Sequence, residues 1–255
     1  MTLTCKTAGE SHGPCGIAFI EGMPAGLSLD TNFINAELKR RQGGYGRGGR
    51  QTIEQDEVVF LSGVRCEVTT GAPIVVQIAN KDNRLNDLSA TPPVHKPRPG
   101  HADLAGSIKW LTNDCRNTLE RASARETAAR TAAGAIARCL LKEFEIEVFG
   151  FVRGMLNVVA PTEITRENWQ EIRDARDDSD TYCPDDASCK SIIAHIRNAK
   201  ENKDTVGGLC ETHVFGCPPG LGSCTQWYEK LDSKLAGAVM GIQAFKSVEI
   251  GLGSK

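Results

Sequence analysis

The sequence has 255 residues, with 30 lysines and arginines against 32 aspartates and glutamates, so its formal net charge is −2. This balance excludes a protein that attracts nucleic acids or anionic membranes through strong overall positive charge. The chain shows no apolar run near the length of a membrane span, and its first residues lack the apolar segment of a secretory signal. We therefore expect a cytoplasmic protein with no nucleic-acid partner and no membrane partner.

Neither the domain organisation nor the cysteines suggest a composite or metal-bound protein. We find no internal repeat, low-complexity block or linker, and we expect a single domain over residues 1–255 with a substantial core. None of the ten cysteines belongs to a C-x-x-C pair, and no Cys/His spacing resembles a zinc finger. The sequence therefore predicts reduced thiols and no metal.

The first two predicted strands, residues 3–8 and 17–21, flank a loop that reads Gly-Glu-Ser-His-Gly over residues 9–13. The two glycines allow a tight turn that holds the His12 imidazole out. A lone loop histidine is often merely exposed. Loops on a rigid scaffold are, however, where catalytic residues concentrate.

A helix capped by Asp30 or Thr31 leads into a segment rich in arginine and glycine, residues 40–50. Five glycines and four arginines in eleven residues exclude a regular helix or a packed strand. Glycines let a backbone approach a ligand, and guanidinium groups such as those of Arg41 and Arg47 match phosphate oxygens. The segment predicts a pocket wall for phosphorylated small molecules. The alternatives are an RNA-binding segment of the Arg-Gly-Gly type and a solvated basic loop.

Residues 58–61, 67–70 and 74–78 are rich in strand-forming residues and predict an antiparallel meander. Residues 80–96 are polar and predict a surface loop, which leads to a turn over residues 98–103.

This turn displays Arg98, His101 and Asp103 within six residues. Another ordered segment is expected to start at residues 108–111, before a turn at residues 113–116.

Ser123 and Glu126 have the spacing of a capping box, which predicts the start of a helix. The first turn of a helix has free N–H donors and a partial positive charge, and Arg121 and Arg125 flank this one. The helix start therefore suits the binding of a phosphate. A well-capped structural helix that binds nothing is the alternative. The following small-residue face is predicted to be core, and consists of Ala128, Ala132, Ala135 and Ile136.

The remaining elements are predicted from their periodicity. They are a hairpin over residues 146–152 and 155–159, helices over 162–177 and 188–200, a strand over 207–215 and a closing helix over 230–245.

Two loop histidines, an arginine-glycine segment and a capped helix start together indicate a pocket for two or more phosphorylated ligands. The imidazoles of His12 and His101 suit proton transfer near neutral pH. The sequence contains no P-loop and no G-x-S-x-G motif, and its glycine-rich runs lack a Rossmann context, so kinase, serine hydrolase and classical dinucleotide oxidoreductase are poorly supported.

Five stretches of the sequence, in this order along the chain, resemble motifs of the chorismate synthase family. They are residues 8–13, 40–50, 98–103, 119–127 and 241–246. The resemblance implies an α+β fold, a β-α-β sandwich of antiparallel sheets around a layer of helices. It also implies a homotetramer.

The resemblance further implies a carbon–oxygen lyase that converts 5-enolpyruvylshikimate 3-phosphate to chorismate with reduced FMN and without net redox change. His12 would act near the departing phosphate, and His101 would sit by the flavin. Arg41 and Arg47 would line an anion site that the family also gives to NADPH. The implied FMN-binding residues are Arg121, Ala122, Ser123, Arg125, Gln243 and Ala244.

The sequence departs from the family pattern at several points. Ala122 stands where the family commonly has Ser, and Gln243 where it commonly has Asn. The resemblance also implies that the family's C-terminal part, with an Arg/Asp pair and a Gly-rich flavin loop, is lacking. The alternatives to an active lyase are therefore an inactive or weakly active fragment of that enzyme and the RNA-binding protein.

Overall fold

The computed structural model describes residues 2–49 and 53–253. Two compact units share the chain. Unit 1 comprises residues 1–29, 56–134 and 217–255, and unit 2 comprises residues 30–55 and 135–216. Arg50, the last residue of the predicted arginine-glycine segment, lies outside the described residues. The expectation of a single domain stays a prediction.

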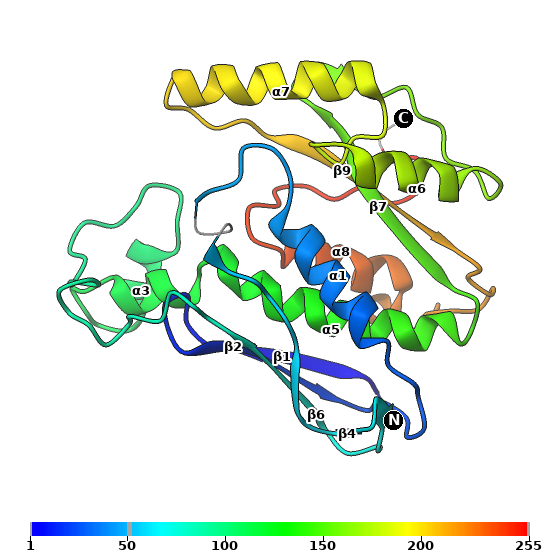
Figure 1. The fold of residues 1–255 in the computed structure, drawn as a ribbon, viewed down its shortest axis with the longest axis horizontal. Coiled ribbons are helices and arrows are strands. Elements are labelled where there is room, and N and C mark those ends of the chain that lie inside the picture. The colour runs from blue at the N-terminus through cyan, green and yellow to red at the C-terminus, as the bar shows by residue number, and fades with distance from the viewer. Residues whose placement is uncertain (1, 50–52, 254–255) are drawn as a thin grey trace. The chain divides into compact units, whose positions relative to one another are not determined.

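Unit 1 is built on a four-stranded antiparallel sheet with the order β1-β2-β6-β3 (Figure 1). Its strands are β1 (Thr4–Ala8), β2 (Cys15–Glu21), β3 (Val59–Ser62) and β6 (Ile74–Ala79). Alternate residues of β6 are buried, as expected for a sheet with one face in the core. The predicted strands at these positions are confirmed.

The predicted meander over residues 58–78 is only partly right. Strand β3 pairs with β6, but β5 (Val68–Thr69) pairs with β4 (Val64–Arg65) in a separate two-stranded sheet. Cys66 and Glu67 both have positive φ angles, of 49° and 59°, as a tight type I′ hairpin turn requires. Because of this turn, β4 and β5 pair with each other and form a sheet separate from the four-stranded one.

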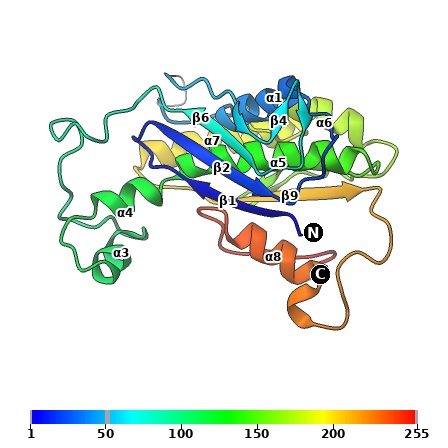
Figure 2. The ribbon, with the colours of Figure 1, turned by 90° about the horizontal axis from the view of Figure 1, so that it is seen from below.

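The helices of unit 1 differ from the sequence predictions at their boundaries. They are α3 (Asp103–Lys109), α4 (Arg116–Arg121), the 3₁₀ turns η1 (Ala124–Glu126) and η2 (Trp227–Glu229), and α8 (Leu231–Met240). Figure 2 shows α3 and α4 close together, in agreement with their contacts.

Two boundary predictions were wrong. The segment expected to start at residues 108–111 is the end of α3, which already begins at Asp103, the last residue of the 98–103 turn. Helix α8 stops at Gly241 rather than continuing to residue 245.

Helix α5 (Thr127–Lys142) contributes residues to both units. Its small residues face the interior as predicted, because Ala128, Ala132, Ala135 and Ile136 are at most 3% exposed.

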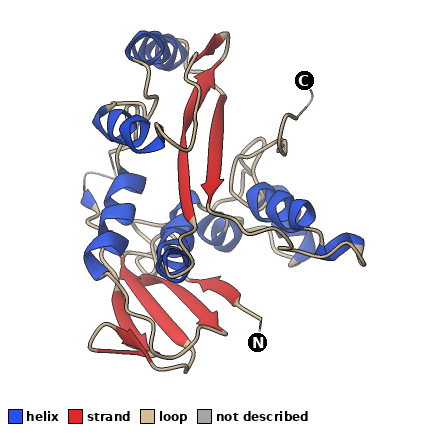
Figure 3. Cartoon of the chain, turned by 90° about the vertical axis from the view of Figure 1, so that its right-hand side faces the viewer, coloured by secondary structure: helices blue, strands red, loops and turns tan. Residues whose placement is uncertain are grey.

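Unit 2 contains a three-stranded antiparallel sheet with the order β8-β7-β9. Its strands are β7 (Glu147–Met155), β8 (Val158–Val159) and β9 (Gly208–Phe215). The described residues of this unit also form the helices α1 (Thr31–Gln42), α6 (Trp169–Asp178) and α7 (Asp186–Glu201). Helices lie along one side of the long strands (Figure 3), and both α6 and α7 contact β7.

Local chemistry explains where two helices of unit 2 begin. Asp30 caps α1, since its side chain accepts from the N–H of Phe33, as predicted. The helix predicted from residue 162 begins only at Trp169, because the Asn168 side chain accepts from Thr165 N and donates to Glu163 O and so holds a turn there. The predicted fold class, antiparallel sheets combined with helices, is confirmed.

Candidate functional site

The loop between β1 and β2 places His12 in unit 1. Gly13 N donates to Glu10 O, which closes the turn, and the Asn80 side chain donates to the carbonyls of Glu10 and Gly13. The His12 carbonyl accepts from Arg84 N at 3.1 Å and from a neighbouring amide. Hydrogen bonds from Asn80, directly after β6, and from Arg84, in the segment that follows, therefore fix the backbone of the histidine loop.

The ring of His12 lies between two carboxylates. Its Nδ1 is 2.8 Å from Glu120 Oε2, and its Nε2 is 3.5 Å from Asp82 Oδ2. The Glu120 side chain is fully buried, whereas those of His12 and Asp82 are each 20% exposed. Asp82 also pairs with Arg84 at 2.9 Å. One nitrogen of the ring thus faces the interior and the other faces the accessible side.

His101 is held in the same manner by the turn in which it was predicted. Its Nδ1 is 2.8 Å from Asp103 Oδ1, and Asp103 also accepts from the backbone and guanidinium of Arg98. The hydrogen bond from Arg98 holds the pKa of the buried Asp103 carboxyl well below its usual range, against the effect of burial. A permanently charged carboxylate therefore orients His101.

A charge interaction between Glu120 and Arg98 relates the two histidine clusters. The hydrogen bond with Asp103 raises the pKa of Arg98, and the negative charge of Glu120 adds to this effect. Arg116 links the same region, because it pairs with Glu120 and donates to the carbonyl of Pro92. The structure thus brings His12 and His101 into the same part of unit 1.

The predicted capping box is only half formed. Ser123 accepts from Arg125 N as a cap should. Glu126 does not reach back, however. Its carboxylate accepts from Thr7 at 2.6 Å, Gln243 at 2.8 Å and Arg130 at 3.0 Å. The bonds from Thr7, Gln243 and Arg130 therefore take the place of the bond between the Glu126 carboxylate and the Ser123 N–H that a complete capping box has.

The arginines beside this turn are engaged with protein groups. Arg125 binds both oxygens of the buried Asp56 at 2.7 Å and donates to Asn80. Arg121 donates to the carbonyls of Thr7 and Gly9, which are neutral oxygens. Of these two arginines, Arg125 is neutralised by Asp56, whereas Arg121 has neutral partners among the residues that the structure describes.

The predicted flavin-binding stretches around residues 121–125 and 243–244 meet at Glu126. Gln243 donates its Nε2 to this carboxylate, while Gln243 Oε1 is buried and has no partner among the described residues. Burial would raise the pKa of Glu126, but the hydrogen bonds from Thr7, Gln243 and Arg130 hold it below its usual range. Ala244 follows with a φ of 69°.

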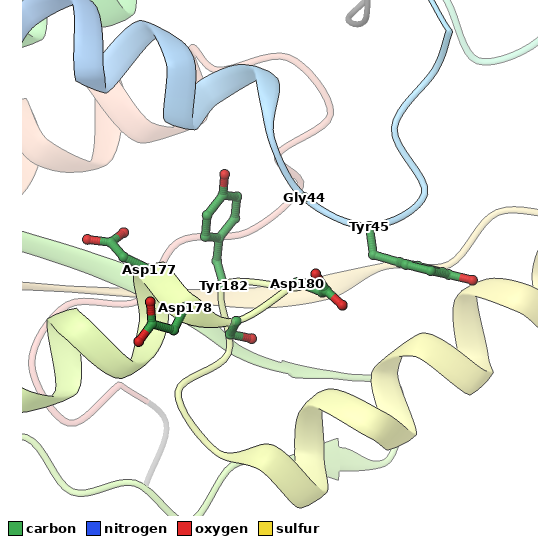
Figure 4. A pocket seen from close by; sticks show the side chains of 7 residues that line it. Gly44, Tyr45, Asp177, Asp178, Asp180 and Tyr182 are labelled. Atoms are coloured by element: carbon green, nitrogen blue, oxygen red, sulfur yellow. The ribbon is translucent and has the colours of Figure 1, made fainter.

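Arg41 and Arg47 belong to unit 2. Arg47 is exposed and donates its Nε to Gly43 O at 2.9 Å. A pocket of about 350 Å³ adjoins this loop, but its lining is acidic rather than arginine-rich (Figure 4). It is formed by Gly44, Tyr45, Asp177, Asp178, Ser179, Asp180 and Tyr182. The arginines therefore do not wall this pocket, and their anion-binding role stays a prediction.

Sequence reasoning missed the carboxylates that hold the site together. Glu120 precedes Arg121 within a motif that was identified, and its spacing of four residues from Arg116 on a short helix was a usable signal. Asp82 lies in a polar loop and carries no such signal. Among the helices that the structure describes, none has the length and apolar character that a membrane span requires.

Comparisons with known proteins show the family of the chain. The family model for chorismate synthase matches residues 3–255. The chorismate synthase of Desulforamulus reducens is 52% identical over 258 residues, which cover 97% of this chain and 66% of that protein. The chorismate synthase of Desulforudis audaxviator is 49% identical over 256 residues, which cover 97% of this chain and 65% of that protein. The chain thus spans just under two thirds of the length of these relatives.

A crystal structure of a chorismate synthase has the same fold. It superposes with a TM-score of 0.84 at 38% identity, and the match covers 99% of this chain and 70% of that one. The chain therefore belongs to the chorismate synthase family.

Proposed function

We propose that this chain catalyses the chorismate synthase reaction, the 1,4-anti elimination of phosphate from 5-enolpyruvylshikimate 3-phosphate to give chorismate. This is the last step of the shikimate pathway, which serves aromatic amino acid biosynthesis. The observation that carries the proposal is the pair of loop histidines, His12 and His101, each bound through Nδ1 by a carboxylate with a fully buried side chain. Imidazoles fixed in this way suit proton transfer at a defined atom.

His12 is assigned to the departing phosphate. Breaking the C–O bond develops negative charge on the leaving oxygens, and an imidazolium that donates from Nε2 stabilises this charge more in the transition state than in the ground state. The 3.5 Å separation between Nε2 and Asp82 is longer than a hydrogen bond, and Asp82 has Arg84 as a second partner. A phosphate can therefore take the place of Asp82 at Nε2.

The residues around Glu126 fit a flavin. Gln243 Oε1 is a buried acceptor with no partner among the described residues, and a flavin ring carries N–H groups that would satisfy it. Ala122, Ser123 and Ala244 would line the ring, and Arg121 would supply positive charge for the FMN phosphate. Arg125, bound to Asp56, would shape the turn. Reduced FMN, when bound, supplies electron density to the substrate as the C–O bond breaks and recovers it afterwards.

The other parts of the proposal rest on the family. His101 would set the protonation of the flavin ring. Arg41 and Arg47 would bind an anionic ligand, with NADPH as a possible flavin reductant. The enzyme would be a cytoplasmic homotetramer. Analytical ultracentrifugation tests the oligomeric state directly.

The decisive experiment is anaerobic. The purified 255-residue chain is mixed with reduced FMN and 5-enolpyruvylshikimate 3-phosphate while chorismate absorbance and phosphate release are followed together. Coupled appearance of both products supports the proposal. Absence of turnover with FMN bound would favour an inactive fragment, and absence of both turnover and FMN binding would overturn the assignment of the flavin residues. Adding NADPH and oxidised FMN instead tests the reductase activity.

A further inference from the structure

We propose that Glu120 is the positioning residue of the site, because it fixes the His12 ring in one orientation and in one neutral tautomer. This inference rests on the proposed function only for its catalytic consequence, since His12 is the group assigned to the substrate phosphate. Its structural content, the position of one hydrogen on one ring, can be measured without turnover.

Glu120 holds His12 at two points. Its Oε2 accepts from the His12 backbone N–H at 2.9 Å and lies 2.8 Å from the ring Nδ1. Binding the backbone and the ring of one residue to the same carboxylate restricts rotation about the bonds between them. Ser11 N also donates to the Glu120 carbonyl at 3.1 Å, which ties the histidine loop to α4.

Glu120 is itself held rigidly. Its side chain has no exposed surface, and Arg116, one turn earlier on α4, pairs with it at 3.2 Å. A buried carboxylate without such donors would carry a large desolvation penalty. Here a guanidinium, a backbone amide and an imidazole converge on it, so its negative charge is directed at Nδ1.

The position of this charge decides the tautomer. A carboxylate accepts hydrogen bonds but cannot donate them, so Nδ1 carries a hydrogen whether the ring is charged or neutral. Among the residues that the structure describes, the charged groups that pair with His12 or with its two carboxylates are Glu120 and Arg116 from α4, and Asp82 and Arg84 from the segment after β6. A proton given to the phosphate therefore leaves from Nε2, and the ring need not rotate during the reaction.

The tautomer is tested by ¹⁵N NMR of the full 255-residue chain with labelled histidine. The sequence has five histidines, so His12→Gln assigns the relevant signal. We expect neutral His12 to carry its hydrogen on Nδ1 in the wild-type protein. A hydrogen on Nε2 would overturn the proposal, and this result does not depend on the folding of any Glu120 variant.

The catalytic consequence is tested with Glu120→Gln, which keeps the shape of the side chain but loses its charge. We expect a mixture of neutral tautomers and a fall in kcat of about a hundredfold with little change in KM. Glu120→Asp, which keeps the charge, is expected to restore the Nδ1–H tautomer in part. Glu171→Gln on the exposed side of α6 is the matched control and should behave as wild type.

The two arms separate the possible failures. An unchanged tautomer and an unchanged kcat in Glu120→Gln would refute the positioning role while leaving the lyase assignment intact. A wild-type chain that makes no chorismate would count against the proposed function, and the NMR result would still decide the role of Glu120.

Discussion

Glu126 is the residue through which three separate parts of unit 1 meet. Thr7 comes from β1, Arg130 from α5 and Gln243 from the turn after α8, and all three donate to its carboxylate. Its side chain is only 5% exposed. The loss of this charge should therefore affect stability as well as the proposed flavin site.

Glu126→Gln is expected to lower the free energy of unfolding at pH 7 by about 1–2 kcal/mol, since the bonds to Arg130 and its neighbours lose a charged acceptor. The pKa of Glu126 is lowered in the folded state, so its stabilising effect is present above about pH 4.5 and is lost as the pH falls through the folded value. The difference between the two proteins should shrink on acidification. Urea unfolding between pH 3 and 7 measures it, and parallel curves would contradict the prediction.

His101→Ala is expected to lower kcat while FMN binding, followed by flavin fluorescence, stays near the wild-type value. The ring is oriented by the charged Asp103, and its role is proton control rather than ligand affinity. Asp103→Asn should lower kcat in the same direction, because Arg98 and His101 both lose their charged partner. His195→Ala on α7 is the control histidine. A wild-type rate in His101→Ala would remove His101 from the mechanism.

At the scale of single residues, the sequence pointed to the candidate catalytic histidines more clearly than to the carboxylates that hold them. His12 and His101 stood out because glycines and a turn surround them. Glu120 did not stand out, because its role depends on a contact 108 residues away in sequence, between α4 and the first loop. Glu126 was assigned to a local cap, and long-range donors displaced that bond. Such contacts carry no local pattern.

The packing of α3 against α4 depends on one glycine. A Cβ added at Gly106 would overlap the Thr118 side chain, so the two helices can approach only without it. Alanine gains at most about 1 kcal/mol of helix propensity over glycine. Overpacking costs about 1–3 kcal/mol, so the clash should dominate.

We therefore expect Gly106→Ala to destabilise the protein and Thr118→Ala to restore most of the loss in the double variant. Gly134→Ala is the matched control, because this glycine of α5 is exposed and has nothing within 4 Å of the added Cβ. It should stabilise by about 0.5–1 kcal/mol. Denaturant unfolding of these three variants and of the wild-type protein gives the comparison, and equal effects at both glycines would refute the packing argument.

Element types were largely predictable from periodicity, while element ends were not. The buried face of α5 and the strands β2 and β6 follow directly from apolar residues in the sequence. The start of α6 instead depends on side-chain bonds such as that between Asn168 and Thr165, and β4 and β5 are separated from the larger sheet by the turn at Cys66. A few hydrogen bonds decide these boundaries, and periodicity does not report them.

The whole molecule is expected to unfold as one domain although its contacts divide into two units. Each unit is assembled from separated stretches of the chain, and α5 begins in unit 1 and ends in unit 2. Helix formation is cooperative along the chain, so losing one half of α5 weakens the other.

Two buried thiols report the two units separately: Cys115, 3% exposed, in unit 1 and Cys183, 1% exposed, in unit 2. Burial also raises the pKa of Cys183, which keeps it unreactive in the folded protein. Pulse alkylation across a urea series, read by mass spectrometry, should give the same midpoint for both thiols, with the exposed Cys66 labelled throughout. Coincident midpoints are what a single cooperative transition requires. Separate midpoints would mean that the interleaved chain does not couple the units and that the molecule consists of two domains.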